Sequence, residues 1–189
     1  MNRDFILASA SPRRFELLRQ VGLSFQSIAP AVDESTDLTD PIEIVSELSV
    51  RKASAVARSN PLSVVIAADT VVVVDGVVLG KPKGEAEAGE MLRKLSGRSH
   101  FVFTGVTVAC DGRMETAICR TEVFFKDLSE ETISAYLRTG EPYDKAGSYG
   151  IQGKGALLVD HIDGDYANVV GLPVSMLDDL LREFGIRLL

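Results

Sequence analysis

The chain has 189 residues, 46% of them hydrophobic and 25% charged, which is enough for one domain with a sizeable core. Its formal net charge of −7 argues against non-specific binding to nucleic acid or to an anionic membrane. No apolar stretch reaches membrane-spanning length, and the first residues do not resemble a signal peptide. Cys110 and Cys119 lack metal-ligand spacing, which fits a reduced, cytoplasmic protein. We therefore expect no nucleic-acid partner, no membrane partner and a cytoplasmic location.

Apolar periodicity predicts strands and helices that alternate along the whole chain. In order, these are a strand (4–8), a helix (12–21), a strand (25–29), a helix (41–60), a hairpin (64–82), a helix (83–95), two long strands (100–110 and 113–125), a helix (128–138), a strand (156–161), a turn with a short strand (164–171) and a closing helix (173–184). There is no internal repeat and no linker. The expected fold class is α/β, with residues 1–189 forming a single domain around one continuous core.

The central hairpin carries the first chemical signal. Residues 64–68 are an apolar run of the kind that fills a strand buried on both faces, and Asp75 and Gly76 form a strong hairpin-turn signal between valine runs. Because the strands on either side of the turn are similar in length, folding is expected to bring Asp69, Thr70 and Lys81 to one end of the sheet. An acid and an ammonium group there are costly unless paired or used. They indicate either a structural salt bridge or a functional site.

A second signal follows the first strand, where residues 9–14 read Ser-Ala-Ser-Pro-Arg-Arg. Ser11 is a natural N-cap and Pro12 suits the first helical position. A helix start offers free backbone N–H groups to an anion. Ser9 adds a hydroxyl, and the guanidinium groups of Arg13 and Arg14 suit phosphate oxygens. Arginines in a first turn oppose the helix dipole, which favours an anion-binding role over two simply solvated side chains.

Further charged residues leave alternatives open. Lys52 falls within the apolar stripe of the helix at 41–60, so it either extends to the edge or reaches a buried anionic site. Glu34 belongs to an acidic loop whose members are usually just solvated. Residues 143–155 hold four glycines in nine positions beside Asp144, Lys145 and Gln152, a composition typical of a ligand loop.

This inventory of basic, hydroxyl and acidic groups suits a polyphosphate bound with a divalent cation, since Mg²⁺ is held by one or two carboxylates plus substrate phosphates. Neither the common phosphate loop nor a G-x-G-x-x-G motif is present. His100 and His161 share no motif, so we interpret each as structural or surface-exposed. Acid–base chemistry then falls to carboxylates or to metal-bound water.

Five motifs together resemble the Maf family and occur in its order along nearly the whole chain. They are Leu-Ala-Ser-Ala-Ser-Pro-Arg-Arg at 7–14, Ala-Asp-Thr at 68–70 with Gly-Lys-Pro at 80–82, the stretch from Ser-Gly-Arg at 96–98 to Thr-Gly at 104–105, Tyr-Asp-Lys-Ala-Gly at 143–147 with Tyr-Gly-Ile-Gln-Gly at 149–153, and Val-Val-Gly-Leu-Pro at 169–173. The resemblance implies a two-lobed, mixed-sheet α/β fold related to the inosine triphosphate pyrophosphatases, with the active site in the cleft between the lobes.

The resemblance also implies an activity: hydrolysis of a nucleoside triphosphate between the α and β phosphates, giving a monophosphate and pyrophosphate. Asp69 resembles the family's proton acceptor, and Arg13, Thr70 and Gln152 match positions linked to substrate choice. Ala-Asp-Thr at 68–70 is similar to the branch that acts on dTTP and UTP, with modified pyrimidine nucleotides as further candidates. An older association of the family with septum inhibition implies the alternative, a nucleotide-binding regulator of cell division without turnover.

A mechanism follows as a hypothesis, with metal-assisted attack of water. Catalytic roles fall to Asp69, Lys81 and Lys52, and a divalent cation, Mg²⁺ or Mn²⁺, would be held by Asp69 and Glu34. The residues expected to bind the nucleoside triphosphate substrate are Ser9, Arg13, Arg14, Thr70, Lys145 and Gln152. Gln152 could read a pyrimidine edge through its amide. A homodimer stays open, because the sequence leaves the oligomeric state undetermined.

Overall fold

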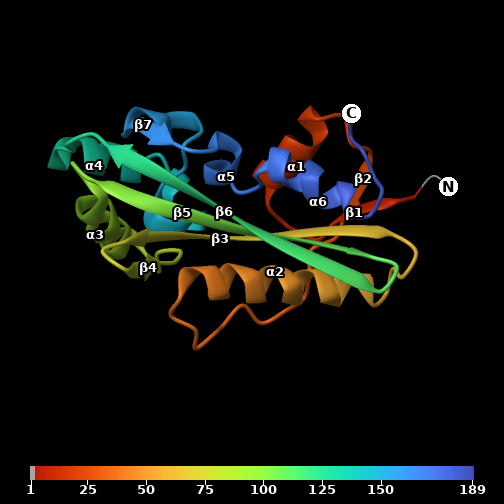
Figure 1. Ribbon diagram of the computed structural model, residues 1–189. Helices are drawn as coiled ribbons and strands as arrows, with labels where there is room; N and C mark the ends of the chain where they lie inside the picture. Colours follow the sequence, from red (N-terminus) through yellow and green to blue (C-terminus); the bar gives the residue numbers. More distant parts are fainter. Residues whose placement is uncertain (1–2) are drawn as a thin grey trace. The chain divides into compact units, whose positions relative to one another are not determined.

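A seven-stranded mixed sheet runs through the structure, a computed structural model that describes residues 3–189 (Figure 1). Its strands are β1 (Phe5–Leu7), β2 (Phe25–Ser27), β3 (Val64–Val74), β4 (Val77–Leu79), β5 (Ser99–Cys110), β6 (Arg113–Phe125) and β7 (Val159–Asp163). They follow the order β2-β1-β3-β5-β6-β7, and β4 pairs with β3. β1 is parallel to β2 and β3, whereas the β3–β4 and β6–β7 pairs are antiparallel. The predicted mixed α/β class is confirmed.

Six helices and three short 3₁₀ helices connect the strands of the described chain. They are α1 (Pro12–Gln20), α2 (Pro41–Ala57), α3 (Glu85–Leu95), α4 (Glu130–Leu137), α5 (Tyr166–Val170), α6 (Val174–Arg182), η1 (Glu141–Asp144), η2 (Ala146–Ser148) and η3 (Gly153–Leu157). None of these helices, in the part of the chain from residue 3 onward, is long and apolar enough to cross a membrane.

The chain divides into two compact units. The first unit holds the chain up to Asp69, Thr104–Cys119 and Gly171–Leu189, and the second unit holds Thr70–Phe103 and Arg120–Val170. The expected single domain with one continuous core stays a prediction.

In the first unit, helix α2 packs on one face of the sheet, and α1 and α6 lie on the other (Figure 1). Ala53 and Val56 of α2 contact a buried cluster that alternate residues of β1 and β3 complete, as the two-residue period of a strand requires. Gly105 of β5 permits this packing, because a Cβ there would lie 2.4 Å from the carbonyl oxygen of Val45.

The second unit has its own apolar cluster, to which β3, α3 and α4 contribute Val72, Leu92 and Ile133 among others. The hairpin between β3 and β4 turns at Asp75 and Gly76, whose φ angles of 51° and 74° are both left-handed. Two left-handed residues are what the type I′ turn of a tight hairpin needs, so Asp-Gly is well suited to the position.

Three predicted elements need correction. β4 is only three residues long, so the hairpin strands are not similar in length. The strand expected at 156–161 begins at Val159, because η3 occupies the preceding residues. The short strand expected within 164–171 is instead α5, since the Asp165 carboxylate accepts hydrogen bonds from the N–H groups of Ala167 and Asn168 and so starts a helical turn.

Candidate active site

The start of α1 presents polar groups in the first unit. Strand β1 ends at Leu7, and Ser9 follows it almost fully buried, its hydroxyl oxygen accepting the N–H of Ser11 at 3.1 Å. Ser11 in turn caps α1 by accepting the N–H of Arg14, and Pro12 takes the first helical position as predicted. A strand that leads directly into a capped helix therefore fixes a serine hydroxyl at the helix N-terminus, where anions are favoured.

Arg13 and Arg14 lie in the first turn of α1, both half-buried. The Arg14 Nε donates to the carbonyl oxygen of Gly171 at 2.7 Å, which holds the guanidinium group in place. Burial lowers the pKa of Arg14, the Asp69 and Glu34 carboxylates oppose this lowering, and the Arg13 charge adds to it. Asp69, Glu34 and Arg13 therefore all act electrostatically on Arg14. Two neighbouring guanidinium groups with a buried carboxylate nearby are suited to bind the negative charge of a phosphate chain.

Lys52 of α2 reaches a buried acid, which decides between the two predicted alternatives. Its Nζ lies 2.6 Å from Asp69 Oδ1, and the two residues are only 6% and 7% exposed. Glu34, more than half exposed, approaches the same ammonium with its Oε1 at 3.3 Å. A buried carboxylate is costly without a partner, and Lys52 supplies one. The structure thus brings together Lys52, Asp69 and Glu34, and the acidic loop does send one member inward.

The oxygen atoms of Asp69 and Glu34 also bear on the predicted cation. They converge on one positive charge, that of Lys52, and hard carboxylate oxygens are the ligands that Mg²⁺ prefers. Within residues 3–189, no group of three or more His, Cys, Asp or Glu side chains is arranged to hold a metal ion. These two carboxylates therefore fit a divalent cation only if other ligands, such as substrate oxygens or water, complete its coordination.

Thr70 and Lys81 belong to the second unit. The β3–β4 ladder pairs Val72 with Leu79, so continuing its register would set Thr70 opposite Lys81, but the strand pairing stops two residues short. Thr70 is half-buried and Lys81 is exposed. The hairpin register therefore agrees with the prediction for this pair, while the backbone between Leu79 and Lys81 has already left the sheet.

The glycine-rich loop of the second unit is folded into η1, η2 and η3. The Lys145 ammonium donates to the Glu141 carbonyl oxygen at 2.5 Å and to Asp144 Oδ1 at 2.6 Å, and its stem lies across Gly150, where a Cβ would come within 2.8 Å of the Lys145 Cε. Gln152 is half-buried in extended backbone just before η3. The loop thus has regular 3₁₀ turns and side-chain hydrogen bonds within it.

Glu141 is a residue of this loop that the sequence analysis did not single out. The Glu141 carboxylate accepts the N–H groups of Lys154 and Gly155 at 3.2 and 3.3 Å. It therefore ties the two ends of the loop together. The only signal in the sequence is an acidic residue beside a glycine-rich stretch, and that pattern does not specify a contact across 13 residues.

The two histidines are placed as predicted. His100 is buried, with its Nε2 2.7 Å from the Tyr149 hydroxyl oxygen, and burial lowers its pKa to about 4. His161 is exposed and lies beside Asp160. Neither lies beside another predicted site residue in these contacts.

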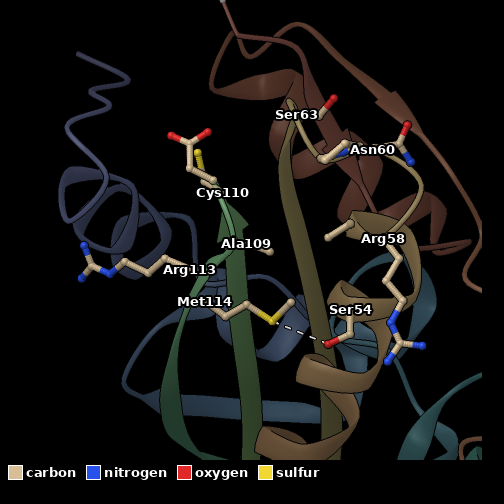
Figure 2. Close-up of a pocket in the computed structure, with 12 residues that line it drawn as sticks. Ser54, Arg58, Asn60, Ser63, Ala109, Cys110, Arg113 and Met114 are labelled. Atoms are coloured by element: carbon tan, nitrogen blue, oxygen red, sulfur yellow. Dashed lines mark hydrogen bonds between the residues drawn. The ribbon is translucent and has the colours of Figure 1, made fainter.

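A cavity of about 340 Å³ at the far end of α2 contains none of the predicted site residues. Its lining includes Ser54 of α2, Arg58 directly after this helix, and residues of the β5–β6 hairpin. In Figure 2, the guanidinium groups of Arg58 and Arg113 point away from each other, and Ser54 is hydrogen-bonded to Met114. Charged groups do not converge there. The polar cluster of Lys52, Asp69 and Glu34 is therefore the stronger candidate for the active site.

Comparison with known proteins first defines the fold. The solved structure of the Staphylococcus aureus Ham1 protein matches 96% of this chain and 100% of its own, with a TM-score of 0.59 and 14% identity. At that identity the likeness concerns the fold alone.

The family follows from the sequence itself. The family model described as Maf-like protein matches residues 4–184, so the chain belongs to the Maf family. A relative from Dictyoglomus thermophilum, named dTTP/UTP pyrophosphatase, is 47% identical over 193 residues and covers all of both chains. A relative from Bacillus cereus with the same name is 51% identical over 185 residues and covers 97% of each chain. The resemblance identified from the five motifs is confirmed.

Proposed function

We propose that this chain is a nucleoside triphosphate pyrophosphatase that hydrolyses dTTP and UTP to the monophosphate and pyrophosphate. The observation that carries the proposal is identity of 47–51% along essentially the whole length to relatives named dTTP/UTP pyrophosphatase. The polar cluster of the first unit supports it, because it combines two guanidinium groups, a buried ion pair and a helix N-terminus, the groups that a triphosphate requires.

In the proposed reaction, the oxygen of a water molecule bonds to the α-phosphorus, and the bond from that phosphorus to the α–β bridging oxygen breaks. Pyrophosphate leaves with the bridging oxygen, and the proton of the water passes to a carboxylate oxygen of Asp69. Lys52, 2.6 Å from that carboxylate, compensates the charge of Asp69 in its buried position. A carboxylate is a weak base, so Asp69 would also position the water for attack.

We assign the remaining predicted residues by their chemistry. Ser9, Arg13 and Arg14 would hold phosphate oxygens at the start of α1, where the helix N-terminus favours anions. Thr70, Lys81 and Lys145 would contribute further donors, Lys81 offsetting charge on the leaving pyrophosphate.

Gln152 would read the pyrimidine. Its amide offers both a donor and an acceptor, which matches the paired donor and acceptor on the edge of uracil or thymine.

Asp69 and Glu34 would hold a divalent cation, Mg²⁺ or Mn²⁺, together with substrate oxygens. When bound, such a cation supplies positive charge that polarises a phosphate and lowers the pKa of water. The Lys52 ammonium faces the same two carboxylates, so cation binding requires Lys52 to share them or to move aside. Removal of the cation by a chelator is expected to abolish turnover.

The test is an analysis of products from a panel of normal and modified nucleoside triphosphates, with Mg²⁺, with Mn²⁺ and with a chelator. We expect UMP and pyrophosphate from UTP, the equivalent products from dTTP, and slower turnover of purine nucleotides. A nucleoside diphosphate with inorganic phosphate would contradict the assigned cleavage position. Tight nucleotide binding without any product would instead favour a regulator of cell division.

A cytoplasmic location is also proposed, supported by Cys110 and Cys119, which form no disulfide in the described part of the chain. The homodimer stays a prediction. Light scattering on the purified chain would give its mass in solution.

A further inference from the structure

The N-terminus of helix η3 is capped by the side chain of Glu141, a residue of η1. The first N–H groups of a helix have no partner within the helix, and the residue just before it usually supplies one from its side chain. Here that residue is Gln152, and it makes no such hydrogen bond. The carboxylate of Glu141 takes its place, with one oxygen on the Lys154 N–H and the other on the Gly155 N–H. The Gln152 amide is therefore not used to cap η3.

Glu141 is itself held from both sides of its peptide. Its N–H donates to the Thr139 hydroxyl oxygen at 3.1 Å, and its carbonyl oxygen accepts from the Lys145 ammonium. Gly153 closes the contact: its φ of 63° is left-handed, and a Cβ there would lie 2.9 Å from Glu141 Oε1. Hydrogen bonds thus hold the Glu141 backbone, and the left-handed backbone at Gly153 leaves room for the Glu141 carboxylate.

Tyr136 provides a second contact that holds the same loop. The hydroxyl oxygen of Tyr136 accepts the Gly150 N–H at 3.2 Å, and burial raises the pKa of Tyr136 to about 12, with Glu141 adding to this rise. The backbone is therefore held at Gly150 by Tyr136 and at residues 154 and 155 by Glu141. Gln152 lies midway between these two points of support.

We propose that Glu141 is a positioning residue for base discrimination: by capping η3 it holds Gln152 where its amide distinguishes uracil from cytosine. The inference rests on the proposed function, in which Gln152 reads the pyrimidine. Uracil presents an acceptor at C4 and cytosine a donor, so discrimination depends on the orientation of an amide that has one of each. The Glu141 carboxylate restricts the loop backbone more than a neutral side chain would, because charge-assisted hydrogen bonds are about twice as strong as neutral ones.

The test compares kcat/KM for UTP and CTP in Glu141→Gln, which keeps the shape of the side chain and removes its charge. We expect the UTP-to-CTP ratio to fall by about tenfold, through loss with UTP rather than an equal loss with both. Glu130→Gln is the matched control, since Glu130 is an exposed carboxylate of the same unit that pairs with Arg93. Its ratio should stay unchanged.

Combination with Gln152→Ala shows whether Glu141 acts through Gln152. The single Gln152→Ala variant should lower the ratio, and adding Glu141→Gln should lower it no further. An equal loss for UTP and CTP in Glu141→Gln, or an unchanged ratio in Gln152→Ala, would overturn the proposal. If Glu141→Gln does not fold, Glu141→Asp carries the same comparison, since its shorter side chain cannot reach both N–H groups.

Failure of the proposed function is separately visible. It would appear as absence of turnover in the unsubstituted protein, whereas failure of this inference would appear as an unchanged ratio in an active one. In an inactive protein, the ratio of UTP and CTP affinities measured by calorimetry replaces the kinetic ratio. A fall in that ratio in Glu141→Gln supports the inference, and an unchanged ratio overturns it.

Discussion

Lys52 and Asp69 are the residues whose burial matters most for the site. Each is less than a tenth exposed, and their charged atoms lie 2.6 Å apart. A pair of this kind contributes little net stability compared with an apolar pair, but removing one partner leaves the other charge buried and uncompensated. The Lys52–Asp69 pair adds little net stability, so a role in the chemistry of the site explains its presence better than a role in stabilising the fold.

Replacing Lys52 with methionine should therefore lower the free energy of unfolding by about 3 kcal/mol at pH 7, because Asp69 loses its partner. The double variant Lys52→Met/Asp69→Asn should recover part of this loss. Urea unfolding of the three proteins measures it, with Lys83→Met as an exposed control. A loss below about 1 kcal/mol for Lys52→Met would show that Asp69 does not depend on Lys52.

His100 gives a pH-dependent prediction. Burial lowers its pKa to about 4, and its Nδ1 has no hydrogen-bond partner among the described residues. The unfolded chain binds a proton near the ordinary value of 6.5, so between these pKa values the unfolded state holds more protons. Stability is then complete above pH 6.5 and falls as the pH drops toward 4, by about 3 kcal/mol in total.

The measurement is the free energy of unfolding at several pH values between 7 and 4 for the unsubstituted protein and for His100→Leu. Loss of the histidine should flatten the curve over this range, and the exposed His161→Leu should leave it unchanged. Parallel curves for the unsubstituted protein and His100→Leu would mean that carboxylates alone cause the acid sensitivity.

At the scale of elements, the contact between α2 and β5 depends on one missing methyl group. A Cβ on residue 105 would lie 2.4 Å from the Val45 carbonyl oxygen, and neither atom can rotate away, because the oxygen belongs to the backbone and a Cβ is bonded directly to it. Helix α2 also carries Lys52, so the position of this helix sets the position of the ammonium beside Asp69.

Gly105→Ala should accordingly destabilise the protein by about 3 kcal/mol, at the upper end of the usual cost of overpacking. Gly80→Ala is the control, because nothing lies within 4 Å of its Cβ position. Thermal unfolding followed by circular dichroism compares the two. Similar midpoints for both variants would show that α2 can shift from β5 at little cost.

The elements also show which parts of the fold were predictable. Long elements such as α2 and β5 have enough residues for their apolar period to be clear, and the Asp-Gly turn at Asp75 needs left-handed backbone that few other pairs adopt. Short ones were missed: α5 has five residues, and its start depends on the Asp165 carboxylate, a local contact that periodicity does not reveal.

For the whole molecule, sequence motifs identified the family, and the residue pattern indicated an anion site before any geometry. The structure added what spacing alone could not give: Lys52 reaches Asp69 from another element, Glu34 joins them, and Glu141 contacts the loop across 13 residues. Contacts of this kind depend on tertiary packing, so a pattern read along the chain specifies the candidates but not the pairs.

The central claim, that Asp69 accepts the proton during hydrolysis of dTTP and UTP, is tested most directly by pyrophosphate release in Asp69→Asn. Asp160→Asn serves as the control, because Asp160 is exposed and pairs with His161. We predict that Asp69→Asn lowers kcat by about 10²–10⁴-fold while the folded protein still binds nucleotide, and that Asp160→Asn is fully active. An Asp69→Asn protein within about threefold of the unsubstituted rate would contradict the assignment, since general-base catalysis contributes far more than that.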